Sequence, residues 1–366
     1  METRQLQLRG EVESLYEARP YPPVGFLTPF LQRVRQEERP TLSYRAAYAA
    51  SYGSTKGAKA APRILVAGCG TFEPVVVALA NPGAEILGVD LSAKSLRQLA
   101  WQARARGLQG RISTWAGALE DLPASLGSFD FIVATGVLHH LVDPSMGLGA
   151  LVSRLNEKGV LRLMVYSQWG RSLLYGAKQL AESLGIRDPK SFREMIGNLP
   201  AGHPYRIYFH LYDDARSDTG LADGYLHPCD QPFTALGLRK LLDGAGLMAT
   251  KFLHAPGGQP EAADRLARLP VDLGTWERLA LLELYGELEK NFTFFACRNG
   301  WRAKPKVSGH EWNPALPRKG RLHSELAGRE LSFDTQATPA IYSPGELREL
   351  ENSLFLLPAA EEGGKG

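Results

Sequence analysis

The sequence contains little cysteine and begins without an apolar segment. Its 366 residues include three cysteines, Cys69, Cys229 and Cys297, which lie far apart. An odd, widely spaced set supports neither a disulfide framework nor a cysteine zinc site, and it is typical of a reducing compartment. The stretch from Met1 to Gly10 lacks the apolar core of a secretory signal or a membrane span. We therefore expect a cytoplasmic protein without a membrane partner.

The chain also lacks a strong charge of one sign. Lysine and arginine number 42 against 39 acidic residues, a formal net charge of +3. No block of basic residues alternates with aromatics, so nucleic acid is not indicated as a partner. Hydrophobic residues make up 44% of the chain, which is ample for the core of an enzyme larger than one small domain.

The most informative motif is a glycine-rich turn that follows an apolar strand. Ile64 to Ala67 leads directly into Gly68-Cys69-Gly70-Thr71, and Asp90 ends the next apolar segment. Glycines let the backbone approach a ligand closely, and an acid at the tip of the next strand can accept both hydroxyls of a ribose. This spacing predicts a site for a nucleoside cofactor.

The residues after the turn bear on which cofactor binds. Phe72 occupies the third glycine position of a dinucleotide site, and Glu73 and Pro74 follow it. A carboxylate at a helix start repels a pyrophosphate, which disfavours an NAD-dependent oxidoreductase. Glu73 suits a cationic ligand such as the sulfonium or ammonium of S-adenosylmethionine, or it merely stabilises the start of its own helix.

Further motifs carry a family resemblance. The apolar segment Phe129 to Ala134 precedes Thr135 to Pro144, which contains the pattern LHHL.DP, and Tyr16 to Pro22 forms a YE..PYP segment before the glycine turn. With that turn and Asp90, these motifs resemble the class I S-adenosylmethionine-dependent methyltransferases, specifically a bacterial group of them. The resemblance implies an α/β fold with a Rossmann-like sheet of seven strands that closes with an antiparallel pair.

The resemblance and the pattern of strands and caps divide the chain into five parts. Residues 61–170 form the cofactor-binding core and residues 234–299 complete its sheet, with Ser92 and Thr234 as helix caps. We expect residues 1–60 to form a helical N-terminal cap and residues 171–233 to form a lid for substrate. Residues 300–366 are expected to be a partly disordered extension with a short helix from Ser343 onward.

The resemblance also assigns site residues. The predicted cofactor-binding residues are Gly68, Cys69, Gly70, Glu73, Asp90, Leu91, Ala118, Leu119, Thr135 and Tyr21. The family usually places an acid near the position of Gly117 to bind the adenine. The chain lacks that acid, so the backbone of Ala118 and Leu119, or the side chains of Glu120 and Asp121, would have to replace it.

The predicted catalytic residues are His140, His139 and Tyr166, which follow the fourth and fifth strands. A histidine that titrates near neutrality can accept the proton of the methyl acceptor. The alternatives are that one histidine only packs against the backbone and that Tyr166 is an aromatic wall. Tyr21 is favoured to contact the sulfonium, whereas the helical spacing of Tyr44, Tyr48 and Tyr52 favours a core role.

Three functions remain open at this stage. The preferred one is methyl transfer to an oxygen or nitrogen of a small molecule or a peptide side chain, because the Asn/Asp-Pro-Pro-aromatic motif of amide methylation is absent. The second is RNA methylation, in which arginines of the lid gather phosphates, and the third is a non-catalytic binding protein on the same fold. We expect no metal, because the remaining histidines and aspartates lack ligand spacing. The arginines are Arg171, Arg193, Arg206 and Arg216; the histidines and aspartates are His203, His210, His227, His254, Asp213, Asp214, Asp223 and Asp230.

Overall fold

A central sheet of seven strands organises the chain. The computed structural model describes residues 2–24, 39–253, 273–286, 291–300, 309–313, 315, 319–324, 329–334, 354 and 356–359. The strands are β1 (Arg63–Ala67), β2 (Glu85–Asp90), β3 (Ile112–Ala116), β4 (Phe129–Thr135), β5 (Leu155–Tyr166), β6 (Leu247–Phe252) and β7 (Asn291–Arg298). Their order is β3-β2-β1-β4-β5-β7-β6, and β7 runs antiparallel to both of its neighbours. The predicted seven-stranded sheet with its antiparallel closing pair is confirmed.

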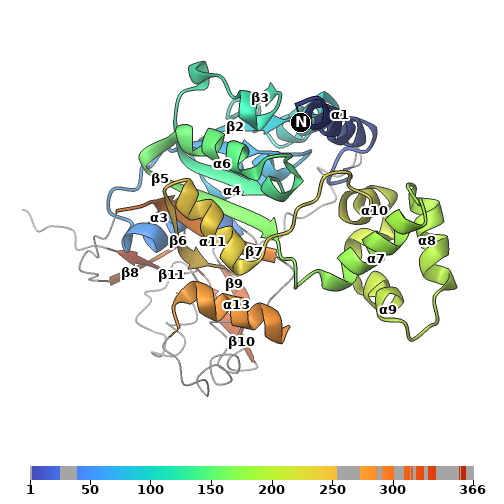
Figure 1. Cartoon of the computed structure of the whole chain (residues 1–366). Coiled ribbons are helices and arrows are strands. Elements are labelled where there is room, and N and C mark those ends of the chain that lie inside the picture. The colour runs from blue at the N-terminus through green and yellow to red at the C-terminus, as the bar shows by residue number, and fades with distance from the viewer. Residues whose placement is uncertain are drawn as a thin grey trace, which may run out of the picture.

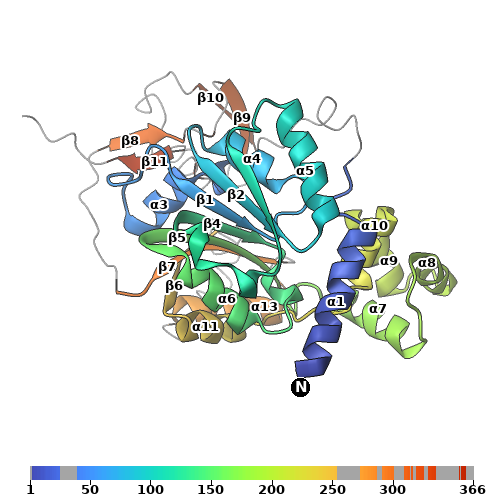
Figure 2. The same cartoon turned by 90° about the horizontal axis from the view of Figure 1, so that it is seen from above.

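Helices cover both faces of this sheet (Figure 2). On one face pack η1 (Arg39–Leu42), α3 (Tyr44–Tyr52), α4 (Glu73–Ala80) and α5 (Ala93–Ala105). On the other face pack α6 (Pro144–Ser153), α11 (Ala235–Gly244) and α13 (Thr275–Tyr285). Short 3-10 turns η2 (Leu119–Asp121), η3 (Ala124–Leu126) and η4 (Leu138–His140) connect the strands. Burying both faces explains the apolar runs of residues 64–67 in β1 and 131–134 in β4.

Local sequence signals set the helix boundaries. The Ser92 hydroxyl accepts a hydrogen bond from the Ser95 amide and begins α5, and the Thr234 hydroxyl accepts one from the Gly237 amide and begins α11. Each hydroxyl satisfies an amide that the helix itself leaves unpaired. Both caps were predicted from the sequence, and both are confirmed.

The tyrosines of α3 belong to the core. Tyr44, Tyr48 and Tyr52 are each at most 5% exposed, and the Tyr48 ring packs against the rings of both Tyr44 and Tyr52. Tyr44 also packs against Phe131 of β4. Their helical spacing therefore reflects packing against the sheet, as the sequence favoured for these three residues.

The insertion after β5 folds into a separate group of helices beside the sheet (Figure 1). It comprises α7 (Ser172–Ser183), α8 (Pro189–Asn198), α9 (Pro204–Leu211), η5 (Asp213–Arg216) and α10 (Asp218–Tyr225). Leu174, Phe192 and Tyr225 are among the residues of its own hydrophobic core. A separate core lets this group hold its shape while presenting α10 to the ends of the strands.

Helix α1 (Glu2–Ala18) bridges the sheet and this insertion (Figure 2). On one side the Lys94 amide donates to the Glu17 carboxylate at 3.0 Å. On the other side the Tyr16 hydroxyl donates to Asp223 of α10 at 2.7 Å. The helix therefore covers the end of the sheet where the parallel strands terminate.

Part of the C-terminal region packs against the core. Strand β8 (Gly309–Trp312) pairs with β11 (Leu356–Ala359), and β9 (Lys319–Ser324) pairs with β10 (Arg329–Asp334). The buried Asn313 amide donates to the carbonyls of Pro40 and Leu354. The short helix predicted from Ser343 and the predicted disordered end lie outside the described residues. Within the described residues, no helix combines the length and apolar character needed to cross a membrane.

Candidate functional site

The glycine turn between β1 and α4 adopts a conformation that requires glycine. Gly68 and Gly70 both have a backbone φ of 55°, a conformation that residues with a side chain rarely adopt. A Cβ on Gly68 would lie 2.5 Å from a Val137 methyl, and one on Gly70 would lie 2.4 Å from the Tyr21 carbonyl oxygen. Val137 and the Tyr21 carbonyl therefore leave no room for a side chain at these two positions.

The segment around Tyr21 is fastened directly to this turn. The Thr71 amide donates to the Tyr21 carbonyl at 3.1 Å, and the Thr71 hydroxyl donates to the Pro22 carbonyl at 2.6 Å. The segment predicted to fold over the cofactor therefore contacts the glycine turn. Tyr21 of this segment lines the adjacent cavity.

Asp90 lies at the end of β2 beside the turn. Its carboxylate oxygens accept hydrogen bonds from the Gly70 amide at 2.8 Å and the Ser92 amide at 2.9 Å. Burial raises the pKa of Asp90, and these two amide hydrogen bonds act in the opposite direction. The amides fix the orientation of the carboxylate, whose remaining lone pairs can accept two vicinal hydroxyls.

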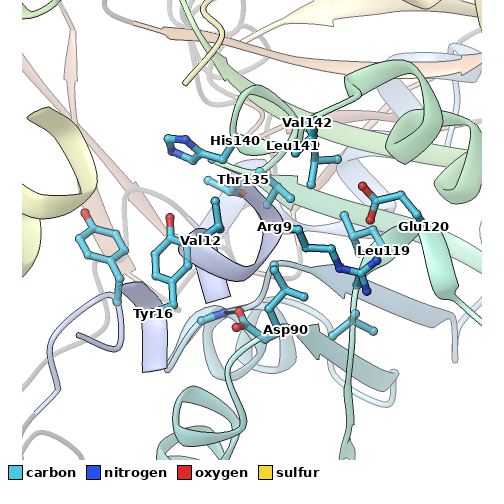
Figure 3. A pocket seen from close by; sticks show the side chains of 18 of the residues that line it. Arg9, Val12, Tyr16, Asp90, Leu119, Glu120, Thr135, His140, Leu141 and Val142 are labelled. Carbon is cyan, nitrogen blue, oxygen red and sulfur yellow. Dashed lines mark hydrogen bonds between the residues drawn. The ribbon is translucent and has the colours of Figure 1, made fainter. Parts of the chain in front are cut away.

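A cavity of about 540 Å³ connects Asp90 with the loops after β4 and β5 (Figure 3). Ten of the predicted site residues line it: Gly68, Gly70, Asp90, Leu91, Ala118, Leu119, Thr135, Tyr21, His140 and Tyr166. This volume lies in the range of sites for drug-sized ligands. The cavity therefore has room for a nucleoside at the Asp90 end and for a second molecule, or part of one, beyond it.

Comparison with known proteins identifies the family of this site. Residues 65–161 match the family described as a methyltransferase domain. An uncharacterized protein of Synechococcus sp. (strain PCC 6301) is 31% identical over 361 residues, which cover 93% of this chain and 84% of that protein. The chain belongs to the class I S-adenosylmethionine-dependent methyltransferases.

Solved structures agree with this assignment at the level of the fold. PKMT2 from Rickettsia typhi superposes with a TM-score of 0.60 at 16% identity, covering 86% of this chain and 64% of that one. Its complex with AdoHcy (S-adenosylhomocysteine) gives a TM-score of 0.59 at 17% identity, covering 84% of this chain and 60% of that one. This methyltransferase thus spans less than two thirds of the length of PKMT2.

The cofactor of this methyltransferase is S-adenosylmethionine, and the residues present fit it. Gly68 and Gly70 leave a cradle that any Cβ would fill, and Asp90 presents an oriented carboxylate. Ala118 and Leu119 line the same cavity. The glycine turn would border the methionine part of the cofactor, Asp90 would hold its ribose, and Ala118 and Leu119 would border its adenine ring.

The absence of an acid at Gly117 has a steric explanation. A Cβ at this position would lie 2.4 Å from the indole ring of Trp115. The ring occupies the space that an acidic side chain would need. Both predicted replacements, the segment of Ala118 and Leu119 and the residues Glu120 and Asp121 of η2, line the cavity.

Cys69 and Glu73 were predicted to bind the cofactor, but they do not line the cavity. The Cys69 amide donates to the Val89 carbonyl at 2.9 Å, and its side chain is buried. Glu73 accepts a 2.6 Å hydrogen bond from the Thr135 hydroxyl, which itself accepts one from Arg162. Glu73 therefore contacts Thr135, which lines the cavity, but does not line the cavity itself.

His140 is the predicted catalytic histidine that lines the cavity. Its Nδ1 lies 3.0 Å from the Cys229 carbonyl oxygen, which can only accept, so this nitrogen carries the proton. In the neutral ring Nε2 then holds a lone pair, and this buried atom has no hydrogen-bond partner among the described residues. The contact with Cys229 thus sets the tautomer that a general base needs.

His139 does not line the cavity and is fully buried. Its ring centroid lies 3.7 Å from that of Tyr166 and 4.1 Å from that of His140. Burial, followed by the charge of His140, holds the pKa of His139 well below its usual range. Its position is that of a neutral packing element behind the two residues that reach the cavity.

Tyr166 forms a wall of the cavity. Burial, followed by the Asp223 carboxylate, raises the pKa of the Tyr166 phenol well above its usual range. The phenol therefore stays protonated at neutral pH and can donate a hydrogen bond. The Arg171 guanidinium lies 3.3 Å from the centroid of the ring, where cation-π attraction holds both groups in place.

A group of possible metal ligands lies behind His140. Single ligand atoms of His139, His140 and Asp230 lie within 4.8 Å of one another. The Asp230 carboxylate, however, already faces the Lys178 ammonium at 3.5 Å and accepts from the Tyr175 hydroxyl at 3.3 Å. Lys178 therefore supplies the positive charge that the carboxylate needs. The sequence did not anticipate this cluster, because its members come from η4 and the end of the insertion.

Several cavity residues were not predicted as site residues. On α1 the residues Gln5, Arg9, Val12 and Tyr16 face the cavity. Their spacing of four, three and four residues defines one helical face, a signal that the sequence did contain. Asp223, Arg171 and Asn291 line the far end, and nothing local marks them, because they come from three separate segments.

Proposed function

We propose that this methyltransferase transfers a methyl group to an oxygen or nitrogen of a small molecule or a peptide side chain. The observation that carries the proposal is a single cavity joining Asp90 and the glycine turn to His140 and Tyr166. The nucleoside end and the acceptor end thus share one space. Helix α1 and the insertion cover this space, which favours a bounded acceptor over an extended one.

In the proposed reaction, different residues bind the cofactor, enclose the acceptor and accept its proton. S-adenosylmethionine supplies an electrophilic methyl carbon. Asp90 holds the ribose, and Ala118 and Leu119 border the adenine. Tyr166 closes the acceptor end against water, and His140 receives the acceptor's proton on Nε2. Holding a nucleophile in line at about 3 Å can supply several kcal/mol of the barrier, and a general base adds a factor of about 10²–10⁴.

The placement of three of the four lid arginines, Arg171, Arg193 and Arg206, does not favour RNA as the acceptor. Arg171 is 3% exposed and faces the cavity. Arg193 pairs with Asp218, and Arg206 donates to the carbonyls of Gly197 and Leu199. Such internal contacts leave these guanidinium groups poorly arranged to gather phosphates along a strand.

Two measurements test the proposal. Calorimetry with S-adenosylhomocysteine should show binding to the wild-type chain, and tritium from [methyl-³H]S-adenosylmethionine should enter a small-molecule or peptide fraction of a cell extract. Transfer into bulk RNA, with binding that weakens steeply as salt is added, would contradict the proposed acceptor class. Failure to bind S-adenosylhomocysteine would contradict the cofactor site itself.

A further inference from the structure

A buried carboxylate lies in the cavity beyond the Asp90 end. Asp223 of α10 is 7% exposed and lines the cavity, and its Oδ1 accepts a 2.7 Å hydrogen bond from the Tyr16 hydroxyl. Tyr16 is also close enough to Asp90 for that carboxylate to affect its phenol. Tyr16 thus contacts Asp223 and lies near the predicted ribose ligand, and the Asp223 charge also acts on the phenol of Tyr166 at the predicted acceptor end.

Three tyrosines line the same cavity as this carboxylate. They are Tyr16, Tyr21 and Tyr166, and the charge of Asp223 reaches the phenols of Tyr16 and Tyr166. A buried carboxylate that lines a cavity attracts a cation through its charge. A neutral hydroxyl gains no such charge–charge attraction.

Arg171 is the basic group at this end of the cavity. Its guanidinium lies against the Tyr166 ring, and its Nε donates to Asn291 at 3.0 Å. An anionic acceptor paired with Arg171 is thus the competing outcome. The reaction itself distinguishes them, because methylation of an amine produces a positive charge that Asp223 stabilises, whereas methylation of a carboxylate removes a negative one.

We propose that the methyl acceptor is an aliphatic amine whose nitrogen is bound by Asp223 in the cavity that Tyr16 and Tyr166 also line. This inference rests on the proposed function and names the substrate class of the same site. The amine enters as an ammonium and gives one proton to Nε2 of His140. Its lone pair then forms a bond to the methyl carbon, the carbon–sulfur bond breaks, and that electron pair stays on sulfur. The products are a methylated ammonium and S-adenosylhomocysteine.

The test compares three probes of equal chain length: n-hexylamine, 1-hexanol and hexanoate. Calorimetry at neutral pH measures their binding to the full chain saturated with S-adenosylhomocysteine. Tritium transfer from S-adenosylmethionine measures which of them is methylated. We expect binding and transfer for the amine in preference to the alcohol and the carboxylate.

Asp223→Asn is the diagnostic variant, because its amide oxygen can still accept from Tyr16 and keep α1 in place. Losing a charged partner should weaken amine binding and kcat/KM by roughly 10- to 100-fold while the Kd for S-adenosylhomocysteine stays within about twofold. The matched control is Asp218→Asn on the same helix, where the exposed carboxylate pairs with Arg193. This control should behave as wild type.

Four results would overturn the inference. They are preferential binding of hexanol or hexanoate, no binding of the amine, an Asp223→Asn variant that binds the amine as wild type does, and a loss of S-adenosylhomocysteine binding in that variant. The last would place Asp223 in the cofactor site. A wild-type chain that fails to bind S-adenosylhomocysteine would overturn the proposed function as well, so the two failures are distinguishable.

Discussion

Replacing Asp90 tests the cofactor site most directly. The carboxylate already accepts one hydrogen bond on each oxygen, from Gly70 and Ser92. Each oxygen has a second lone pair, so two ribose hydroxyls can bind without displacing either amide. Asp90→Ala removes all four acceptor positions and should therefore weaken S-adenosylhomocysteine binding.

The magnitude follows from these hydrogen bonds. A hydrogen bond to a charged group contributes about 1.5–3 kcal/mol, and water partly replaces the lost partner. We expect a net loss of roughly 1–3 kcal/mol, a Kd increased roughly 5- to 150-fold. The variant also leaves two amides without their acceptor, so its fold must be verified by circular dichroism and thermal unfolding. Asp90→Asn keeps one amide oxygen and serves as the milder variant.

The assay is isothermal titration of S-adenosylhomocysteine into each variant. Glu85→Gln is the control, because Glu85 begins the same strand and its side chain is 81% exposed. It removes one negative charge from β2 without touching the cavity. A folded Asp90→Ala variant that binds as tightly as Glu85→Gln would refute the reasoning, since the ribose would then lie elsewhere.

Three further predictions concern the base, the adenine wall and the pH dependence of stability. His140→Ala should lower kcat by about 10²–10⁴ with an unchanged Kd for S-adenosylhomocysteine; a near wild-type rate in single-turnover assays would mean that positioning alone explains catalysis. Gly117→Ala should reduce the free energy of unfolding by about 1–3 kcal/mol in urea titrations, because its methyl group meets the Trp115 ring, and no loss of stability would show that the ring moves freely. Burial raises the pKa of Glu283, so the folded state binds more protons and the free energy of unfolding should fall as pH rises from the ordinary glutamate pKa through the raised one. Glu283→Gln should flatten that slope, and identical slopes in both proteins would contradict the assignment.

The glycine turn and Asp90 could be placed together at one cavity from the sequence because their signals are local. Gly68, Gly70 and Asp90 stand at the carboxyl ends of adjacent parallel strands, and the order of the chain alone brings such ends together. The strands themselves are short apolar runs bounded by glycine and cap residues. For the same reason the closing strand pair was predicted correctly.

The acceptor half could not be predicted in the same way. Tyr16 and Asp223 are 207 residues apart in the sequence, and their contact depends on where α1 and α10 pack. Neither residue stands in a motif with ligand spacing. Helix α1 did carry a signal, because Arg9, Val12 and Tyr16 share one face, but a helical face does not reveal what it covers.

The roles of the paired histidines illustrate the same limit. His139 and His140 are adjacent and chemically identical, yet only His140 lines the cavity. His140 also contacts the Cys229 carbonyl, which belongs to the end of the insertion and fixes the Nδ1 proton of His140. The insertion therefore contacts the proposed base through Cys229 and supplies the proposed acceptor-binding carboxylate, Asp223. Since one segment controls both the proton acceptor and the nearby charge, changes within it should alter the acceptor while leaving the glycine turn and Asp90 to bind the same cofactor.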